Sequence, residues 1–127
     1  MLVRLFAFIA FTLALIWLAS IRPIIANATY WGFTFKLTHI GAFAVHFVLT
    51  WAVLKPLLRG TGRTLVASLL VSAAVGALIE VIQLYLPHRR GRASDMIQNA
   101  IGMAVGIAAL LTWHGISALV RGKSDKT

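Results

Sequence analysis

Residues 64–86, TLVASLLVSAAVGALIEVIQLYL, decide the fold class, because this long apolar stretch carries a single charged side chain, Glu80. A helix needs about 20 mostly apolar residues to cross a hydrocarbon core of about 30 Å. Pro87 follows the stretch directly, and proline cannot continue a helix without losing a backbone hydrogen bond. The pattern predicts a transmembrane helix over residues 64–86.

Three further stretches show the same pattern. No charged residue lies between Arg4 and Arg22, between Lys36 and Lys55, or between Asp95 and Arg121. They predict further transmembrane helices over residues 4–22, 37–55 and 96–119. The predicted fold is therefore all-α, an integral membrane bundle of four transmembrane helices in a single domain over residues 1–127.

The composition agrees with a membrane protein and argues against other classes. The chain is 60% hydrophobic and 12% charged, whereas about 25% of the residues of an average soluble domain are charged. The net charge of +9 comes from basic residues between the apolar stretches, where they meet anionic lipid headgroups. No nucleic-acid-binding motif accompanies them, so we expect no nucleic-acid partner. The chain has no cysteine, which excludes disulfides and thiolate chemistry.

The distribution of lysine and arginine predicts the orientation in the membrane, since cytoplasmic loops carry the excess. Seven lie on the N-terminal side of the predicted bundle: Arg4, Lys55, Arg59, Arg63, Arg121, Lys123 and Lys126. Five lie on the other side: Arg22, Lys36, Arg89, Arg90 and Arg92. We therefore predict that both termini are cytoplasmic.

Residues 24–35, between the first two predicted helices, admit two interpretations. They hold Tyr30, Trp31, Phe33 and Phe35, and aromatic side chains favour the membrane interface. We interpret them as an interfacial segment rather than a soluble loop. Alternatively, the Ala-Asn-Ala sequence at 26–28 ends a cleavable signal peptide, which would remove the first helix and leave three.

The polar residues of the predicted helices gather at one face of the membrane. The second helix begins there, the third ends there and the fourth begins there. The residues concerned are Lys36, His39, Glu80, Gln83, Arg89, Arg90, Arg92, Asp95 and Asn99. Ser94 and Asp95 suit the N-terminal cap of the fourth helix. We predict that this cluster is extracytoplasmic.

Helical spacing predicts that the cluster faces into the bundle. Small residues continue the face of Glu80 along the third helix, and those of the fourth continue the face of Asn99, since positions three or four apart share one face. The small residues are Ser68, Ser72, Gly76, Gly102 and Gly106. Small residues allow helices in lipid to approach closely, and we interpret the Gly102–Gly106 pair as packing within one chain rather than between two.

Three short motifs together resemble the VanZ-like family of small bacterial membrane proteins. They are Lys36-Leu-Thr-His39-Ile, Glu80-Val-Ile-Gln83, and Arg90 followed by Asp95-Met-Ile-Gln-Asn99-Ala-Ile-Gly102. The match covers roughly residues 35–107. The family often has an acidic residue before the lysine, and this chain has Phe35 there. The resemblance implies a multi-pass protein of the bacterial inner membrane and a link to resistance against the glycopeptide teicoplanin.

Three functions stay open at this point. The first is binding of a phosphate-bearing lipid or a lipid-linked cell-wall precursor through the cluster. The arginines would donate hydrogen bonds to the phosphate oxygens. The second is an intramembrane enzyme on a lipid-linked phosphate, with Glu80 or His39 as acid–base. The third is a structural subunit of a larger complex, or an oligomer of this chain, in which the cluster joins helices.

Several polar residues also have a purely structural interpretation beside the functional one. Glu80 is interpreted as half of an ion pair with Arg90 or Lys36. His46 and His114 are interpreted as structural residues. A metal site built from His39, Glu80 and Asp95 lacks diagnostic ligand spacing, and no nucleophile or nucleotide motif is present. We therefore expect no metal and no cofactor.

Overall fold

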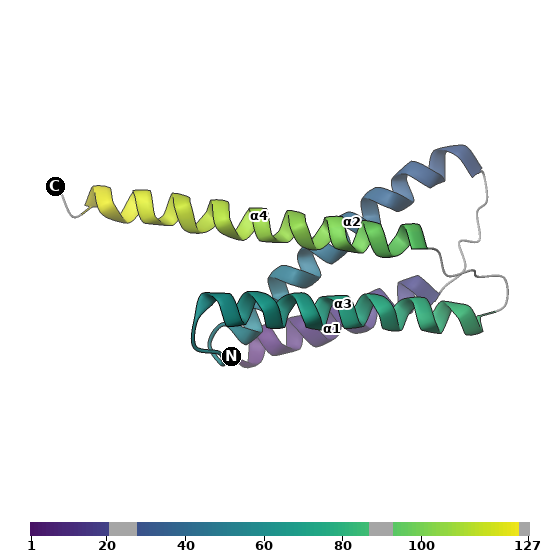
Figure 1. Ribbon diagram of the computed structural model, residues 1–127, viewed down its shortest axis with the longest axis horizontal. Helices are drawn as coiled ribbons and strands as arrows, with labels where there is room; N and C mark the ends of the chain where they lie inside the picture. Colours follow the sequence, from purple (N-terminus) through teal and green to yellow (C-terminus); the bar gives the residue numbers. More distant parts are fainter. Residues whose placement is uncertain (21–27, 87–92, 125–127) are drawn as a thin grey trace.

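Four α-helices form the part of the chain that the structure describes (Figure 1). The structure is a computed structural model, which describes the backbone of residues 1–20, 28–86 and 93–124, and the side chains of residues 1–20, 36–86 and 94–117. The helices are α1 (Leu2–Ser20), α2 (Ala28–Leu54), α3 (Thr61–Tyr85) and α4 (Ala93–Ser124). Each contains a stretch long and apolar enough to cross a membrane. The predicted class, an all-α membrane bundle, is confirmed.

The second helix begins earlier than the charge pattern predicts. It starts at Ala28 rather than at residue 37, so residues 28–35 belong to the second helix and do not form a separate link before it. Lys36 ends the apolar stretch, but a single lysine does not end a helix, because lysine is a good helix former. The fourth helix is also longer than the predicted 96–119 and begins at Ala93. Ser94 and Asp95 therefore lie in its first turn and not at its cap.

The helices alternate in direction, so that their ends gather at two levels (Figure 1). At one level α1 ends, α2 begins, α3 ends and α4 begins; we call this the polar end. At the opposite end lie the N-terminus and the turn that joins α2 to α3. The C-terminal part of α4 runs beyond the other helices at this opposite end.

The turn between α2 and α3 is built on one proline and one glycine. Pro56 is the second residue after the end of α2. The amides of Leu57 and Leu58 both donate to the carbonyl of Leu54, at 3.0 and 2.9 Å. Gly60 then has a φ of 96°, a conformation that residues with a side chain rarely adopt. Its carbonyl accepts the amide of Thr64 at 3.2 Å, which starts α3.

We expect Gly60→Ala to lower the free energy of unfolding by about 1 kcal/mol, near the low end of the range for a strained backbone position. The matched control is Gly62→Ala in the first turn of α3, where an added Cβ meets no atom within 4 Å. Alanine favours a helix over glycine by up to about 1 kcal/mol, so the control should be neutral or stabilising. Both are measured by SDS titration of the purified protein; equal effects would contradict the role of the Gly60 conformation.

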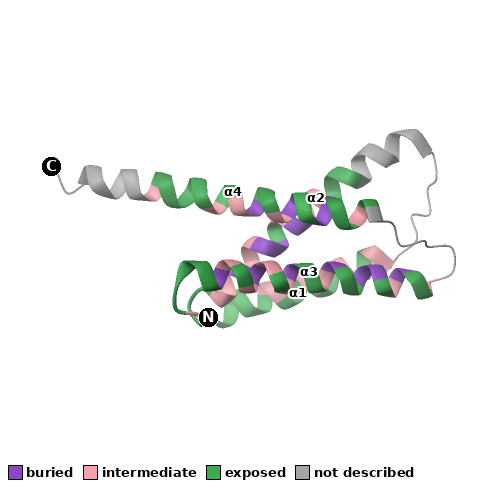
Figure 2. Cartoon of the chain, in the orientation of Figure 1, coloured by how far each residue is buried: buried purple, intermediate pink, exposed green. Residues whose placement is uncertain are grey.

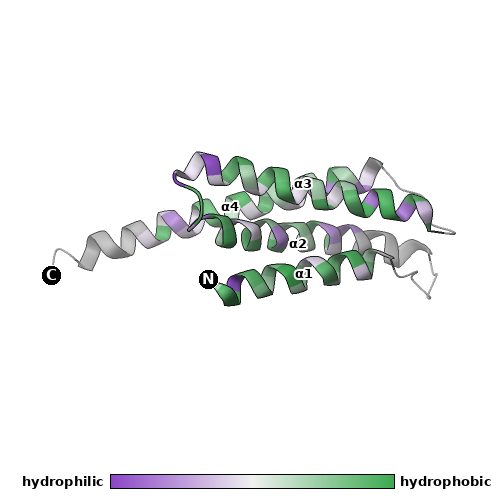
Figure 3. Ribbon diagram, turned by 90° about the horizontal axis from the view of Figure 1, so that it is seen from below, coloured by the Kyte–Doolittle hydropathy of each residue, from purple (hydrophilic) through white to green (hydrophobic). Residues whose placement is uncertain are grey.

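Helix α2 is the centre of the bundle. It contacts all three other helices, and its contact with α4 is the most extensive. In the view of Figure 3, α2 lies between α1 on one side and α3 on the other. Helix α1 also contacts α3, but no residue of α1 is fully buried. The bundle is thus tightest around α2 and loosest at α1.

The interior of the bundle is more polar than its surface. The fully buried side chains include His46, Thr50, Thr64, Ser68 and Ser72. Large apolar side chains are exposed along all four helices. Figure 2 marks the buried positions along the ribbon, and Figure 3 shows that the helices are mostly apolar. Lipid is an apolar solvent, so apolar side chains lose nothing at the surface, whereas polar groups find partners only inside.

Candidate functional site

Side chains of α2 and α4 meet at the polar end. The Nδ1 of His39 lies 3.3 Å from Oδ1 of Asn99. An amide oxygen only accepts hydrogen bonds, so His39 donates and its Nδ1 carries the proton. Asn99 is 5% exposed, whereas His39 is half-buried. The pair therefore reaches from the bundle interior to the edge of the bundle.

Helix α3 joins this pair through Gly76. A Cβ at Gly76 would lie 3.0 Å from Nδ2 of Asn99 and 3.3 Å from the ring of Phe43. Both distances are shorter than ordinary contact, so a glycine lets α3 approach Asn99 this closely. The position predicted for packing thus lies directly behind the polar pair, and three helices converge on Asn99.

Glu80 and Gln83 continue the buried face of α3 towards the polar end. Glu80 lies one turn beyond Gly76 and is 9% exposed; Gln83 is 2% exposed. The Gln83 amide donates from Nε2 to the carbonyl of Ala19 at 3.1 Å, which ties α3 to the end of α1. Both side chains therefore lie among helices and not against lipid.

Two charged residues lie at the rim of this cluster. Lys36 is exposed on α2, one turn before His39. Asp95 is half-buried, and one of its carboxylate oxygens accepts the hydroxyl of Ser94 at 3.1 Å. A carboxylate in the first turn of a helix interacts favourably with the helix dipole. The three predicted arginines, Arg89, Arg90 and Arg92, lie outside the described residues, and with them the expected pairing of Glu80 with Arg90.

Gln98 is a buried residue outside the predicted cluster. It is 8% exposed, and its Oε1 has no hydrogen-bond partner in the described part of the chain. The signal was available, because Gln98 lies one turn before Gly102 and so shares the face of α4 that packs on α2. An amide in that position adds hydrogen-bonding capacity beside the cluster.

The glycines of α4 pack against α2. A Cβ at Gly102 would lie 2.5 Å from the carbonyl oxygen of Ile40 and 2.8 Å from Cβ of Phe43. At Gly106 it would lie 2.9 Å from the carbonyl oxygen of Ala44. Backbone atoms cannot swing aside, so glycine is required for this approach. The contact places His39 opposite Asn99.

Deeper in the bundle, His46 joins three helices. It is fully buried, with Nε2 3.1 Å from the hydroxyl of Thr12 on α1 and Nδ1 3.1 Å from the hydroxyl of Ser72 on α3. Thr12 donates its own proton to the carbonyl of Phe8 at 2.7 Å. Thr12 therefore accepts from His46 Nε2–H, and Nδ1 accepts from Ser72. This arrangement satisfies a neutral imidazole and agrees with a structural role.

A cavity of about 300 Å³ opens beside the polar pair. Helix α1 contributes Leu15, Leu18 and Ala19 to its wall, and α2 contributes His39 and Ala42. Apart from His39 and a neighbouring threonine, the lining is apolar. One end of the cavity is therefore polar and the remainder suits hydrocarbon.

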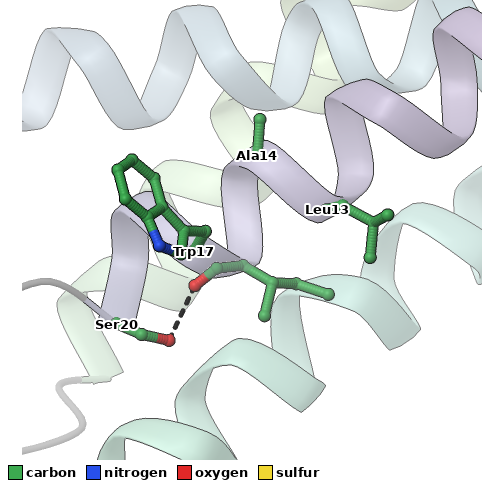
Figure 4. A pocket seen from close by; sticks show the side chains of 5 residues that line it. Leu13, Ala14, Trp17 and Ser20 are labelled. Carbon is green, nitrogen blue, oxygen red and sulfur yellow. Dashed lines mark hydrogen bonds between the residues drawn. The ribbon is translucent and has the colours of Figure 1, made fainter.

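A wider hollow of about 580 Å³ lies on the outside of α1 (Figure 4). Its lining comes from this single helix and includes Leu13, Ala14 and Trp17. Its one hydroxyl, on Ser20, donates to the carbonyl of Ile16 at 2.7 Å. With no titratable group and no second helix to form a wall, this larger hollow is a surface for bulk lipid. The smaller cavity at His39 is the better candidate site.

Metal ligation finds no basis in the described ranges. There, no group of three or more His, Cys, Asp or Glu side chains lies close enough together to hold a metal ion. His39, Glu80 and Asp95 belong to the polar end, but they do not form such a group. The described site offers imidazole and amide groups for hydrogen bonding, the carboxyl groups of Glu80 and Asp95, and the charge of Lys36.

Four membrane-length helices around a polar interior, with a polar cluster and an apolar cavity at one end, define a multi-pass membrane protein. A protein-family model described as VanZ/LLP1 matches residues 3–114. The chain therefore belongs to the VanZ/LLP1 family, as its three short motifs indicated. No curated protein and no solved structure matches the chain.

Proposed function

We propose that this protein binds a phosphate-bearing lipid, or a lipid-linked cell-wall precursor, at its polar end. The observation that carries the proposal is the hydrogen-bonded pair of His39 and Asn99, 3.3 Å apart, which reaches the edge of the bundle. Polar groups inside a membrane are costly, and residues that stay there are by default candidates for a functional site.

The charge around the pair supports a phosphate ligand. Lys36 is exposed one turn from His39, and Arg22, Arg89, Arg90 and Arg92 lie in the sequence segments that flank the polar end. Ammonium and guanidinium groups form charge-assisted hydrogen bonds with phosphate oxygens. The amide nitrogen of Asn99 adds a donor of fixed position, and the imidazole of His39 offers a second N–H, at Nε2, in its protonated form. The buried Glu80 supplies a counter-charge that would orient basic side chains at this end.

We place the polar end on the extracytoplasmic side of the bacterial inner membrane. The support is the count of seven basic residues at the opposite end against five at the polar end, since cytoplasmic segments carry the excess of lysine and arginine. On this orientation, the ligand is a lipid of the outer leaflet. A precursor exported for cell-wall synthesis has the chemistry that the site requires.

The proposal is tested with dodecyl phosphate as the probe and the purified protein in phosphatidylcholine nanodiscs. We expect His39→Ala and Asn99→Ala each to weaken binding about tenfold, because hydrogen bonds to charged groups contribute about 1.5–3 kcal/mol. The matched control is His114→Ala, which removes an exposed histidine of α4 far from the polar end. Native mass spectrometry counts the bound probe.

Two outcomes would contradict the proposal. The first is binding of dodecyl alcohol as tight as that of dodecyl phosphate, because the phosphate would then contribute nothing. The second is an equal loss in the His114→Ala control. Inorganic phosphate is the further comparator, and full competition by it would identify free phosphate rather than a lipid as the ligand.

We extend the proposal to glycopeptide resistance, which the sequence resemblance implies. A protein that holds a cell-wall precursor at the outer face would change how much of that precursor is accessible. The test is the teicoplanin susceptibility of a sensitive host that expresses the chain, compared with the Asn99→Ala variant. Unchanged susceptibility with both would remove resistance from the proposed function.

A second candidate, a structural subunit, is favoured by one observation. Both ring nitrogens of the buried His46 are hydrogen-bonded to hydroxyls of neighbouring helices. Polar groups of this bundle therefore also act as links between helices. If the pair of His39 and Asn99 is only such a link, its loss lowers stability and leaves probe binding unchanged.

A further inference from the structure

The volume and the lining of the cavity beside His39 suit a hydrocarbon chain. Its volume is about 300 Å³, and three helices line it. Leu15 and Leu18 of α1, Ala42 of α2 and Ile79 of α3 supply apolar surface. The imidazole of His39, hydrogen-bonded to Asn99, lies in the same lining. The cavity is therefore amphiphilic, with its polar part at the cluster.

We propose that this cavity holds one hydrocarbon chain of the lipid whose phosphate is bound at the polar end. The inference rests on the proposed function for the headgroup and adds a place for the tail. His39 is the residue that both parts share, so a single ligand reaches from the polar pair into the cavity without leaving the protein. The site would thus distinguish a lipid by its chain as well as by its phosphate.

The surrounding solvent favours a hydrocarbon chain as the occupant of the cavity. An apolar cavity stays dry, because water needs two to four polar partners. An empty cavity is also costly, since its lining atoms lose dispersion contacts. In a bilayer, the molecules available to fill the cavity are the hydrocarbon chains of lipids. Helix α1, which has no buried residue, forms one wall, so lipid lies directly on its other side.

The hydrocarbon chain contributes little to the free energy of binding. Lipid tails are as apolar as leucine, so a chain gains little hydrophobic energy by moving from bilayer to cavity. Selectivity for the tail must come from shape and from the bound headgroup that positions it. A change that fills the cavity should therefore expel the chain while it weakens headgroup binding less.

The matched pair of variants lies at adjacent positions of α2. Ala42→Phe places a ring in the cavity, because Ala42 lines it. Gly41→Phe adds the same ring where a Cβ meets no atom within 4 Å, and so it points away from the packed interior. A second filling variant, Leu18→Trp, changes a side chain that is 59% exposed on α1. It preserves the test if Ala42→Phe fails to fold.

The probe is dodecyl phosphate with a diazirine in its chain, photolysed in phosphatidylcholine nanodiscs, and the labelled residues are mapped by mass spectrometry. We expect labels on Leu15, Leu18 and Ile79 in the native chain and in Gly41→Phe. Filling the cavity with Ala42→Phe or Leu18→Trp should reduce these labels about tenfold, the equivalent of about 1.4 kcal/mol. Total bound probe should fall less.

The outcomes separate this inference from the proposed function. Saturable binding of the phosphate probe with labels spread evenly over exposed residues of all helices would overturn the cavity site and leave headgroup binding intact. Equal labelling of the cavity by the corresponding diazirine alcohol would leave the chain site intact and count against phosphate recognition. Labelling that Gly41→Phe reduces as much as Ala42→Phe would also overturn the inference.

Discussion

Gly102→Ala should lower the free energy of unfolding by about 2–3 kcal/mol, the upper part of the usual range for overpacking a tightly packed contact. The added Cβ would lie 2.5 Å from the carbonyl oxygen of Ile40. That obstacle is backbone, so only a separation of α2 from α4 relieves the clash. This contact is the most extensive in the bundle, and SDS titration followed by tryptophan fluorescence measures its loss.

The matched control for this prediction is Gly115→Ala on the same helix. There an added Cβ meets no atom within 4 Å, so only the helix propensity changes, by up to about 1 kcal/mol in favour of alanine. The two substitutions are chemically identical and should have opposite signs. A neutral Gly102→Ala would mean that α4 does not pack on α2 through this glycine.

His46→Ala should lower the free energy of unfolding by about 2–4 kcal/mol, since truncation of large buried side chains to alanine commonly costs about 2–5 kcal/mol. The imidazole is fully buried, with the rings of Phe8 and Phe43 at 5.4 and 6.0 Å from its centre. Its removal leaves a cavity and breaks the links to Thr12 and Ser72. The exposed His114 provides the control, and His114→Ala should be neutral.

A double-mutant cycle isolates the hydrogen bond from the cavity. Comparing His46→Ala, Ser72→Ala and the double variant should give a coupling of about 0.6 kcal/mol, the average for hydrogen bonds between membrane helices, and of at most about 1.7 kcal/mol. Additive effects would show that His46 stabilises by volume alone. The cycle also bears on the site, because His46 and His39 lie on one helix and the orientation of α2 sets both.

The number and kind of helices could be predicted from the sequence, because a bilayer imposes a length and a polarity on each span. A stretch such as residues 64–86 has the length of one helical span, and a helix satisfies its backbone amides within the segment, as lipid requires. Helix ends were less predictable. The start of α2 at Ala28 was missed because Lys36 interrupts the apolar stretch without interrupting the backbone hydrogen bonds.

The sequence predicted at which end of the bundle the candidate site lies, but not which side chains contact one another there. Alternating helix direction places His39, Glu80 and Asn99 at the same end of the bundle, which the sequence order implies. The partner of each side chain depends on how the helices rotate and cross. The bond of Gln83 to the carbonyl of Ala19 involves a backbone group of α1 that no sequence pattern marks. Thr12 likewise gained its role only through its neighbour His46.

By itself, the sequence determined that this protein is a four-helix membrane bundle of the VanZ/LLP1 family with a polar cluster at one end. The spacing of polar residues and the length of each apolar stretch are local properties of the sequence. In lipid, these two properties are enough to predict a transmembrane helix. Only the tertiary structure decided that α2 is central, that Gly102 faces Ile40, and that His39 lines a cavity beside Asn99. Those features depend on shape complementarity between helices distant in sequence, since lipid offers no hydrophobic preference for one pairing over another.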